Sequence, residues 1–275
     1  MSIAKLGAGA GAAALVLGGG GWGMSVLFSN MMPTFKTLKE IGGTGYDTKY
    51  AKDFKSLFVD DGSDKNKDWW EWSYKNRWLS DKDGSEESTK PKNKFKDLKG
   101  GFKRKDSDSD NFLNKKCKDA YGAESAKVKK DANDNDEFEE RDVWRYCSIG
   151  GIKPVLVSEN SSGYESDKFG DKSGLKGKLV SVKKEDKDST DWFWEIREHE
   201  FRYGKGGDAV TGTGSQSETT NSIFRELFDG TRKGTVKETC KEAYEATQNG
   251  TDTHKFHESD IKKFCFLIPD GLNNS

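Results

Sequence analysis

The strongest constraint on the fold is an internal similarity between two parts of the chain that lie 123 positions apart. The segment Asp-Trp-Trp-Glu-Trp, which begins at Asp68, resembles Asp-Trp-Phe-Trp-Glu, which begins at Asp191. The segment Cys-Lys-Asp-Ala-Tyr from Cys117 reappears as Cys-Lys-Glu-Ala-Tyr from Cys240, again 123 positions later. Two separate matches at one spacing predict a duplicated folding unit, because self-similarity at a fixed distance is the signature of repeated structure.

Weaker similarities extend both copies. Residues 44–47 resemble 162–165, and residues 144–147 resemble 262–265, in both cases at a spacing of 118. Each copy therefore contains a Gly-Tyr start, a Trp cluster, a first cysteine and a second cysteine preceded by an aromatic residue. We predict an amino-terminal segment, a first repeat domain and a second repeat domain, with the boundaries 1–30, 31–150 and 151–275.

The four cysteines occupy equivalent positions, two in each copy. Four cysteines permit three connectivities, and the repeat favours one bridge inside each copy. This interpretation pairs Cys117 with Cys147 and Cys240 with Cys265. Disulfides persist outside the reducing cytosol, so the pairing predicts an exported protein. The alternative is that all four are buried free thiols, which are common core residues.

The amino-terminal segment contains an uninterrupted run of 23 uncharged residues from Leu6 to Phe28. A helix needs roughly 20 apolar residues to cross a bilayer, so this run predicts a retained single-pass anchor. The alternative is a signal peptide cleaved near residues 21–23. Lys5 on one side and Lys36 and Lys39 on the other leave the orientation undecided by charge. We expect the protein in the cell membrane, with the carboxyl-terminal region extracellular.

The composition predicts a folded chain with a polar surface. Charged residues make up 34% of the sequence, but the 46 basic and 47 acidic residues nearly cancel. Nucleic-acid binding requires a concentrated basic surface, so we expect no nucleic-acid partner. Aromatic residues reach 12%, and such large apolar side chains can support small cores.

Apolar spacing predicts a mainly α fold with long polar loops, among them 81–93 and 204–218. Residues 46–58 suit one amphipathic helical face, and Asp68 is expected to cap a helix that continues to Trp78. Short strands are expected at 154–157 or 178–182. The other predicted helices cover residues 110–117, 136–147, 191–201, 222–228, 236–246 and 258–264.

No combination of residues forms a recognised catalytic motif. His199-Glu200 begins like a zinc-protease helix motif but lacks the second histidine. The acidic pairs Asp68/Glu71 and Glu195/Glu198 could do acid–base work, yet a chain with 47 carboxylates has many such pairs on solvated helix faces. The Trp clusters are interpreted as core. A zinc site would use cysteines and histidines at spacings that match no zinc motif, namely Cys240, His254, His257 and Cys265. We therefore predict no catalytic residue, no metal and no cofactor.

The layout resembles the paralogous, uncharacterised, membrane-anchored surface proteins of haemotropic mycoplasmas. The shared features are a Gly/Ala-rich membrane segment, polar Lys/Asp/Glu-rich repeats, a Trp-containing helix in each repeat, and an aromatic residue before the second cysteine, as in Tyr146-Cys147 and Phe264-Cys265. Phe264 stands where that family more often has Trp. The resemblance implies exposure on a bacterial cell surface and supplies no catalytic residues.

These features predict a cell-surface interaction or antigen protein without catalytic activity. Its expected partners are the lipid bilayer and a host or cell-surface protein, and its ligand-binding residues are unknown. The alternatives are an ectoenzyme, such as a hydrolase that acts through carboxylates, and a structural component of the envelope.

Overall fold

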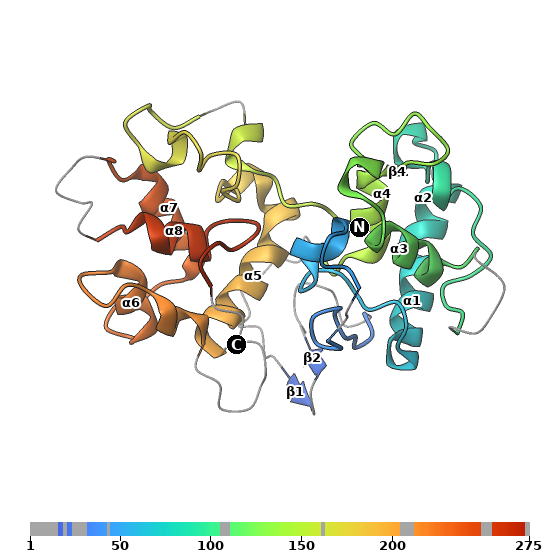
Figure 1. Ribbon diagram of the computed structural model, residues 1–275, viewed down its shortest axis with the longest axis horizontal. Coiled ribbons are helices and arrows are strands. Elements are labelled where there is room, and N and C mark those ends of the chain that lie inside the picture. Colours follow the sequence, from blue (N-terminus) through green and yellow to red (C-terminus); the bar gives the residue numbers. More distant parts are fainter. Residues whose placement is uncertain are drawn as a thin grey trace, which may run out of the picture.

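The computed structural model describes residues 16–18, 21–23, 32–42, 45–104, 111–160, 163–203, 212–248 and 255–272. The fold is mainly helical, as predicted, and it contains two disulfides. Two helical lobes lie side by side (Figure 1). The first lobe comprises the described residues from 32 to 150 and contains α1 to α4. The second lobe comprises those from 151 onward and contains α5 to α8.

The expected membrane anchor at residues 6–28 lies largely outside the described residues. Within it, β1 (Val16–Gly18) and β2 (Gly21–Gly23) form an antiparallel pair. In the described parts of the chain, none of the helices is both long and apolar enough to span a bilayer.

The Trp-rich segment of the first lobe forms one continuous helical stretch. It begins with α1 (Lys67–Ser73), passes through a π-helical turn (Tyr74–Trp78) and ends with α2 (Leu79–Asp83). The expected cap is wrong, since Asn66 holds the N-cap position and Asp68 lies in the first turn. This segment packs beside α3 (Leu113–Tyr121) and α4 (Glu140–Cys147), and β3 (Val128–Lys129) runs parallel to β4 (Phe138–Glu139).

The second lobe is built around α5 (Lys187–Tyr203), against which α6 (Ile223–Phe228), α7 (Val236–Glu245) and α8 (Glu258–Phe264) are arranged. The side chains of Ser222 and Thr235 cap α6 and α7 by accepting backbone N–H groups. Short 3-10 turns connect the elements of both lobes, at Tyr50–Phe54, Asp64–Asn66, Glu87–Thr89, Asn93–Phe95, Ser125–Lys127, Val157–Glu159, Phe169–Asp171, Lys184–Asp186 and Thr213–Gln216.

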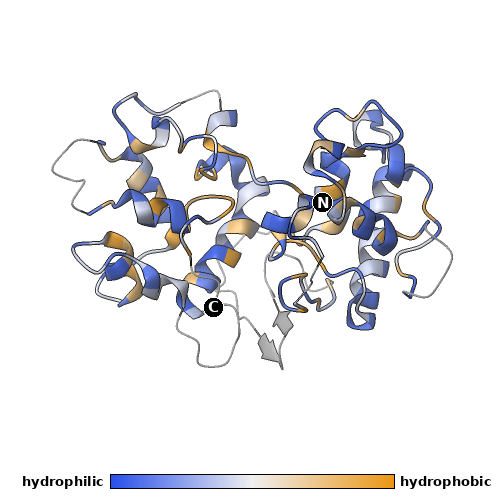
Figure 2. Cartoon of the chain, in the orientation of Figure 1, coloured by the Kyte–Doolittle hydropathy of each residue, from blue (hydrophilic) through white to orange (hydrophobic). Residues whose placement is uncertain are grey.

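Aromatic side chains form the core of a chain whose helices are mostly hydrophilic on the outside (Figure 2). The largest fully buried side chains in the first lobe include Trp69, Trp70, Trp78 and Trp144. In the second lobe Phe193, Phe201 and Phe224 are buried in the same way. A buried aromatic side chain removes a large apolar area from water, so few anchors suffice for each core. Trp69, Trp70, Trp192 and Trp194 of the two clusters are therefore core residues, as predicted, whereas Trp72 is only partly buried.

In the first lobe the disulfide Cys117–Cys147 joins α3 to the end of α4, and both cysteines are fully buried. The Tyr121 hydroxyl, one turn after Cys117, donates to the carbonyls of Val59 (2.9 Å) and Cys147 (3.1 Å). The Val59 amide also donates to the Cys147 carbonyl at 3.1 Å. The bridge is thus surrounded by buried hydrogen bonds that tie it to an upstream extended segment.

In the second lobe Cys240–Cys265 joins α7 to the residue after α8, and these cysteines are also fully buried. The Tyr244 hydroxyl donates to the carbonyls of Val180 (3.0 Å) and Cys265 (3.3 Å). The Val180 amide donates to the Cys265 carbonyl at 3.1 Å. Both predicted disulfides are therefore present, and each has the same set of hydrogen-bond partners around it.

A buried aspartate lies five residues before the second cysteine of each lobe. In the first lobe the Lys92 amide donates to Asp142 Oδ2 at 2.6 Å, and burial raises the pKa of this carboxyl to about 6. In the second lobe the Glu218 amide donates to Asp260 Oδ1 at 3.0 Å, and the Ser222 hydroxyl donates to Oδ2 at 2.6 Å. Each carboxylate anchors a preceding loop to the helix that carries it.

The lobes meet where the first one ends. The ring centroids of Trp144 and Trp192 lie 6.4 Å apart. A Cβ atom at Gly150 would come within 2.1 Å of the Trp192 ring, so only glycine allows this contact with the backbone. The relative position of the lobes therefore depends on the packing of Trp192 against Gly150 and Trp144, at the end of the first lobe.

Candidate binding cleft

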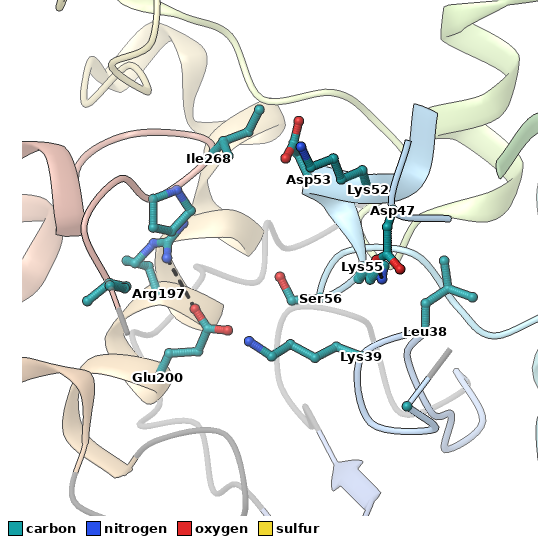
Figure 3. A pocket seen from close by; sticks show the side chains of 13 residues that line it. Leu38, Lys39, Asp47, Lys52, Asp53, Lys55, Ser56, Arg197, Glu200 and Ile268 are labelled. Carbon is teal, nitrogen blue, oxygen red and sulfur yellow. Dashed lines mark hydrogen bonds and ion pairs between the residues drawn. The ribbon is translucent and has the colours of Figure 1, made fainter. Parts of the chain in front are cut away.

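A cleft with a volume of about 530 Å³ opens between the two lobes (Figure 3). This volume falls within the range of small-molecule sites, which is roughly 300–1,000 Å³. Residues from the amino-terminal part of the first lobe form one wall, and α5 with the carboxyl-terminal segment forms the other. Its charged and hydroxyl-bearing lining residues are Lys39, Asp47, Lys52, Asp53, Lys55, Ser56, Arg197 and Glu200.

Opposite charges are paired within each wall. Arg197 Nη1 lies 3.2 Å from Glu200 Oε2, and Lys55 Nζ lies 2.7 Å from Asp47 Oδ1. The Lys39 ammonium group extends from the first lobe toward the Glu200 carboxylate on the opposite wall (Figure 3). The cleft thus places cations and carboxylates at short range, and the lining contains four cations and three carboxylates.

Arg197 is the most deeply buried of the cations, with 4% of the residue exposed. Burial lowers the pKa of its guanidinium, and the neighbouring Glu200 raises it. Nη2 donates to the carbonyls of Phe266 and Leu267 at 3.3 and 3.4 Å, close to the upper limit for a hydrogen bond. Nε has no hydrogen-bond acceptor among the described residues.

Arg77 provides a matched comparison in the first lobe. Its guanidinium is also buried and donates to the carbonyls of Arg145 (3.1 Å), Ser148 (2.7 Å) and Ile149 (2.8 Å), which follow the second cysteine or lie just before it. Arg77 therefore has well-formed partners, whereas Arg197 has long bonds and an unused donor. Of the two guanidinium groups, the one with the weaker hydrogen bonds, Arg197, is the one that lines the cleft.

The remaining wall of the cleft is apolar. Leu38 contributes from the first lobe, and Ile268, Pro269 and Leu272 contribute from the carboxyl-terminal segment. Ile268 is 38% exposed, unlike the core residues around it. The cleft thus offers both charged groups and apolar surface to a small ligand.

A second cleft between the lobes, with a volume of about 590 Å³, has a different character. Its charges neutralise one another at short range. Arg145 forms two bonds with Asp81, at 2.8 and 3.0 Å, and Lys153 lies 2.8 Å from Glu140. The first pair joins two helices of the first lobe, and the second joins α4 to the start of the second lobe. This second cleft is therefore a weaker candidate for ligand binding.

One residue of each acidic pair considered from the sequence has a structural partner. Glu71 Oε1 accepts the Phe102 amide at 3.0 Å, and Glu198 Oε1 accepts Arg202 Nε at 2.8 Å. His199 is buried in α5, and burial lowers its pKa to about 4.

The two cysteines considered for a zinc site, Cys240 and Cys265, form a disulfide with each other. His254 lies outside the described residues, and His257 Nε2 lies 2.9 Å from the Thr220 carbonyl. In the described parts of the chain, no group of three or more His, Cys, Asp or Glu side chains could hold a metal ion. The cleft itself was not predictable from the sequence, because its walls come from four separated segments.

Glu195 on α5 predicts a pH dependence of stability. Burial, with a contribution from Asp191, raises its pKa to about 7. The unfolded carboxyl ionises near its ordinary pKa while the folded one keeps its proton, so stability is expected to fall as the pH rises from about 4.5 to 7. We expect Glu195→Gln to stabilise the protein by about 1 kcal/mol at pH 8, after allowance for partial solvent exposure, and to have no effect at pH 4.

This prediction is checked by urea unfolding at several pH values. Glu245→Gln, at an exposed position on α7, is the control and is expected to leave the pH slope unchanged. Equal pH slopes for the wild type and Glu195→Gln would show that the Glu195 carboxyl titrates normally.

No protein-family model, curated protein or solved structure matches this chain.

Proposed function

We propose that this chain is an exported, membrane-anchored surface protein that binds a partner non-covalently and catalyses no reaction. The observation that carries the proposal is the pair of fully buried disulfides, because such bridges form and persist outside the reducing cytosol. The uncharged run at residues 6–28 supplies the anchor in this proposal. The partner is a host or cell-surface molecule, as the resemblance to mycoplasma surface proteins implies.

In this proposal the two lobes are diverged copies of one disulfide-closed domain, at 31–150 and 151–275. Three sets of contacts support the duplication. The Tyr121 and Tyr244 hydroxyls have matching acceptors beside the two bridges. The buried Asp142 and Asp260 hold equivalent loops. In both lobes a guanidinium donates to the carbonyls that follow the second cysteine.

Duplication also supplies a reason for the binding cleft. Two copies joined by a short segment create a surface between them that neither copy has alone. Each lobe contributes both charged and apolar residues to the 530 Å³ cleft. A binding role requires such a lined surface, and the lining offers cations, carboxylates and aliphatic groups to a partner.

Limited trypsin treatment of intact cells tests the proposal. Peptides that end at the exposed Lys99 of the first lobe and Lys233 of the second lobe are expected in the supernatant, while a cytoplasmic marker protein stays intact. A variant that lacks residues 1–30 is the control and is expected to be protected inside the cell. Release of peptides only after lysis would contradict the proposal.

A further inference from the structure

We propose that the cleft between the lobes binds the carboxylate of an apolar ligand, with the Arg197 guanidinium as its anchor. This inference rests on the proposed binding function and names the chemistry of the ligand. The same chemistry occurs at the carboxyl terminus of a peptide with aliphatic side chains and in a small branched organic acid.

The first argument is the unused hydrogen-bonding capacity of Arg197. A guanidinium has five N–H donors in a fork that matches a carboxylate. Arg197 uses Nη1 for Glu200 at 3.2 Å and Nη2 for two carbonyls at 3.3 and 3.4 Å, and Nε has no acceptor. Nε is itself buried and has no partner, which is costly, so a ligand oxygen would be favourable once a rotation of the Arg197 side chain brings this donor to the cleft.

The comparison with Arg77 strengthens this argument. Arg77 fills an equivalent role in the first lobe, and its three carbonyl bonds measure 2.7 to 3.1 Å. Backbone carbonyls can therefore bind both Nη groups of a buried guanidinium at short distances in this fold. Arg197 lines the cleft with weaker carbonyl bonds and a carboxylate side chain, Glu200, at its edge.

The second argument is the balance of charge. Four cations and three carboxylates line the cleft, and one of the cations is the exposed Lys52. The pair Lys55–Asp47 is neutral as a unit, and so is the pair Arg197–Glu200. A cleft with an excess of positive charge attracts an anion and raises its local concentration.

The third argument is the apolar surface that lies beside the charged groups on both walls. Leu38, Pro269, Leu272 and the 38% exposed Ile268 are available to cover aliphatic groups next to the carboxylate. Burial of apolar area contributes roughly 25 cal/mol per Å², so aliphatic groups would add affinity that a bare anion lacks. A free inorganic anion therefore fits the site less well than an aliphatic acid.

The test is titration calorimetry on the full chain in lipid nanodiscs with two matched pairs of probes. One pair is N-acetyl-leucyl-leucine with a free carboxylate and the same dipeptide as its amide. The other pair is 4-methylpentanoate and 4-methylpentanamide. At least one acid is expected to bind about 10-fold more tightly than its amide. Preference for the dipeptide acid identifies a peptide terminus as the source, and preference for 4-methylpentanoate identifies a free organic acid.

Two further measurements locate the binding site. The Arg197 Nε–H resonance, assigned with Arg197→Lys, is expected to shift on addition of the acid and to stay unchanged with the amide. Lys52→Glu is expected to weaken binding about 5-fold, whereas Lys75→Glu, an exposed change on the helical stretch of the first lobe, leaves it unchanged.

The inference is overturned if acid and amide bind equally, if neither acid binds more tightly than about 1 mM, or if Lys52→Glu and Lys75→Glu act alike. Failure here leaves the proposed surface function intact when trypsin still releases both lobes from intact cells. Failure of the trypsin experiment with successful acid binding would instead place a working cleft inside the cell.

Discussion

Replacement of both Cys240 and Cys265 by alanine is expected to lower the free energy of unfolding of the second lobe by about 3–4 kcal/mol. The bridge closes a loop with a sequence separation of 25 residues, and its loss increases the entropy of the unfolded chain. The fully buried position of both cysteines means that alanine also removes packing contacts. Since small domains are stable by only about 5–15 kcal/mol, this is a large fraction of the total.

Urea unfolding followed by tryptophan fluorescence measures the effect. Cys117→Ala with Cys147→Ala is the matched variant, and its separation of 30 residues predicts a loss of similar size in the first lobe. If the lobes unfold separately, each double substitution is expected to shift one transition and spare the other. A loss below about 1 kcal/mol in both variants would show that the cores alone hold the lobes together.

Arg77→Met is expected to lower the free energy of unfolding by about 3–5 kcal/mol. The substitution leaves three buried carbonyls without their donor, and burial already lowers the pKa of this guanidinium to about 9. It also removes the cation from its positions 5.6 Å from the Trp69 ring and 4.9 Å from the Trp72 ring.

Arg104→Met is the control for Arg77→Met, because among the described residues Arg104 forms only an exposed ion pair with Asp64. Its effect is expected to stay within about 0.5 kcal/mol. Chemical denaturation of both variants and the wild type under the same conditions gives the comparison. Equal stabilities of the two variants would mean that water replaces the Arg77 donor without cost.

The sequence predicted those elements whose signals are local. The predicted helix at 258–264 matches α8, and Ser222 caps α6 as its position before an apolar run suggests. The four cysteines pair as the repeat predicted. Short bridges also occur near the expected strands, between Leu156 and Val180.

Tertiary contacts decided the elements that the sequence did not predict. Residues 46–58 have helical spacing, yet only Tyr50–Phe54 forms a short 3-10 turn. The backbone is not helical after this turn because the Val59 amide donates to the Cys147 carbonyl. The Leu38 amide also donates to the Phe58 carbonyl. Such long-range hydrogen bonds override a local preference.

The polar segment 81–93 was expected to be a long loop. Residues 81–83 instead continue the helix of the Trp cluster, and Glu87–Thr89 forms a 3-10 turn. Arg141 donates to the Lys90 carbonyl at 2.6 Å, and Asp142 accepts the Lys92 amide. A polar composition does not reveal that a buried carboxylate elsewhere in the chain will bind the backbone of the segment.

The candidate site was beyond sequence reasoning for a similar reason. Leu38, Ser56, Arg197 and Ile268 come from distant parts of the chain, and no motif connects them. In the sequence Arg197 is one polar residue of an ordinary amphipathic helix, and nothing marks it as a binding residue. Its importance depends on the long carbonyl bonds and the unused Nε, which only the packed structure reveals.

Peptide mapping of the cysteines tests the central claim of an exported, twice disulfide-closed chain most directly. Intact cells are treated with a membrane-impermeant thiol reagent and digested without reduction. Peptides that link Cys117 to Cys147 and Cys240 to Cys265, with no labelled thiol, are the predicted result. Four unlabelled free thiols, which react only after lysis, would place the domain in the cytoplasm and contradict the surface function.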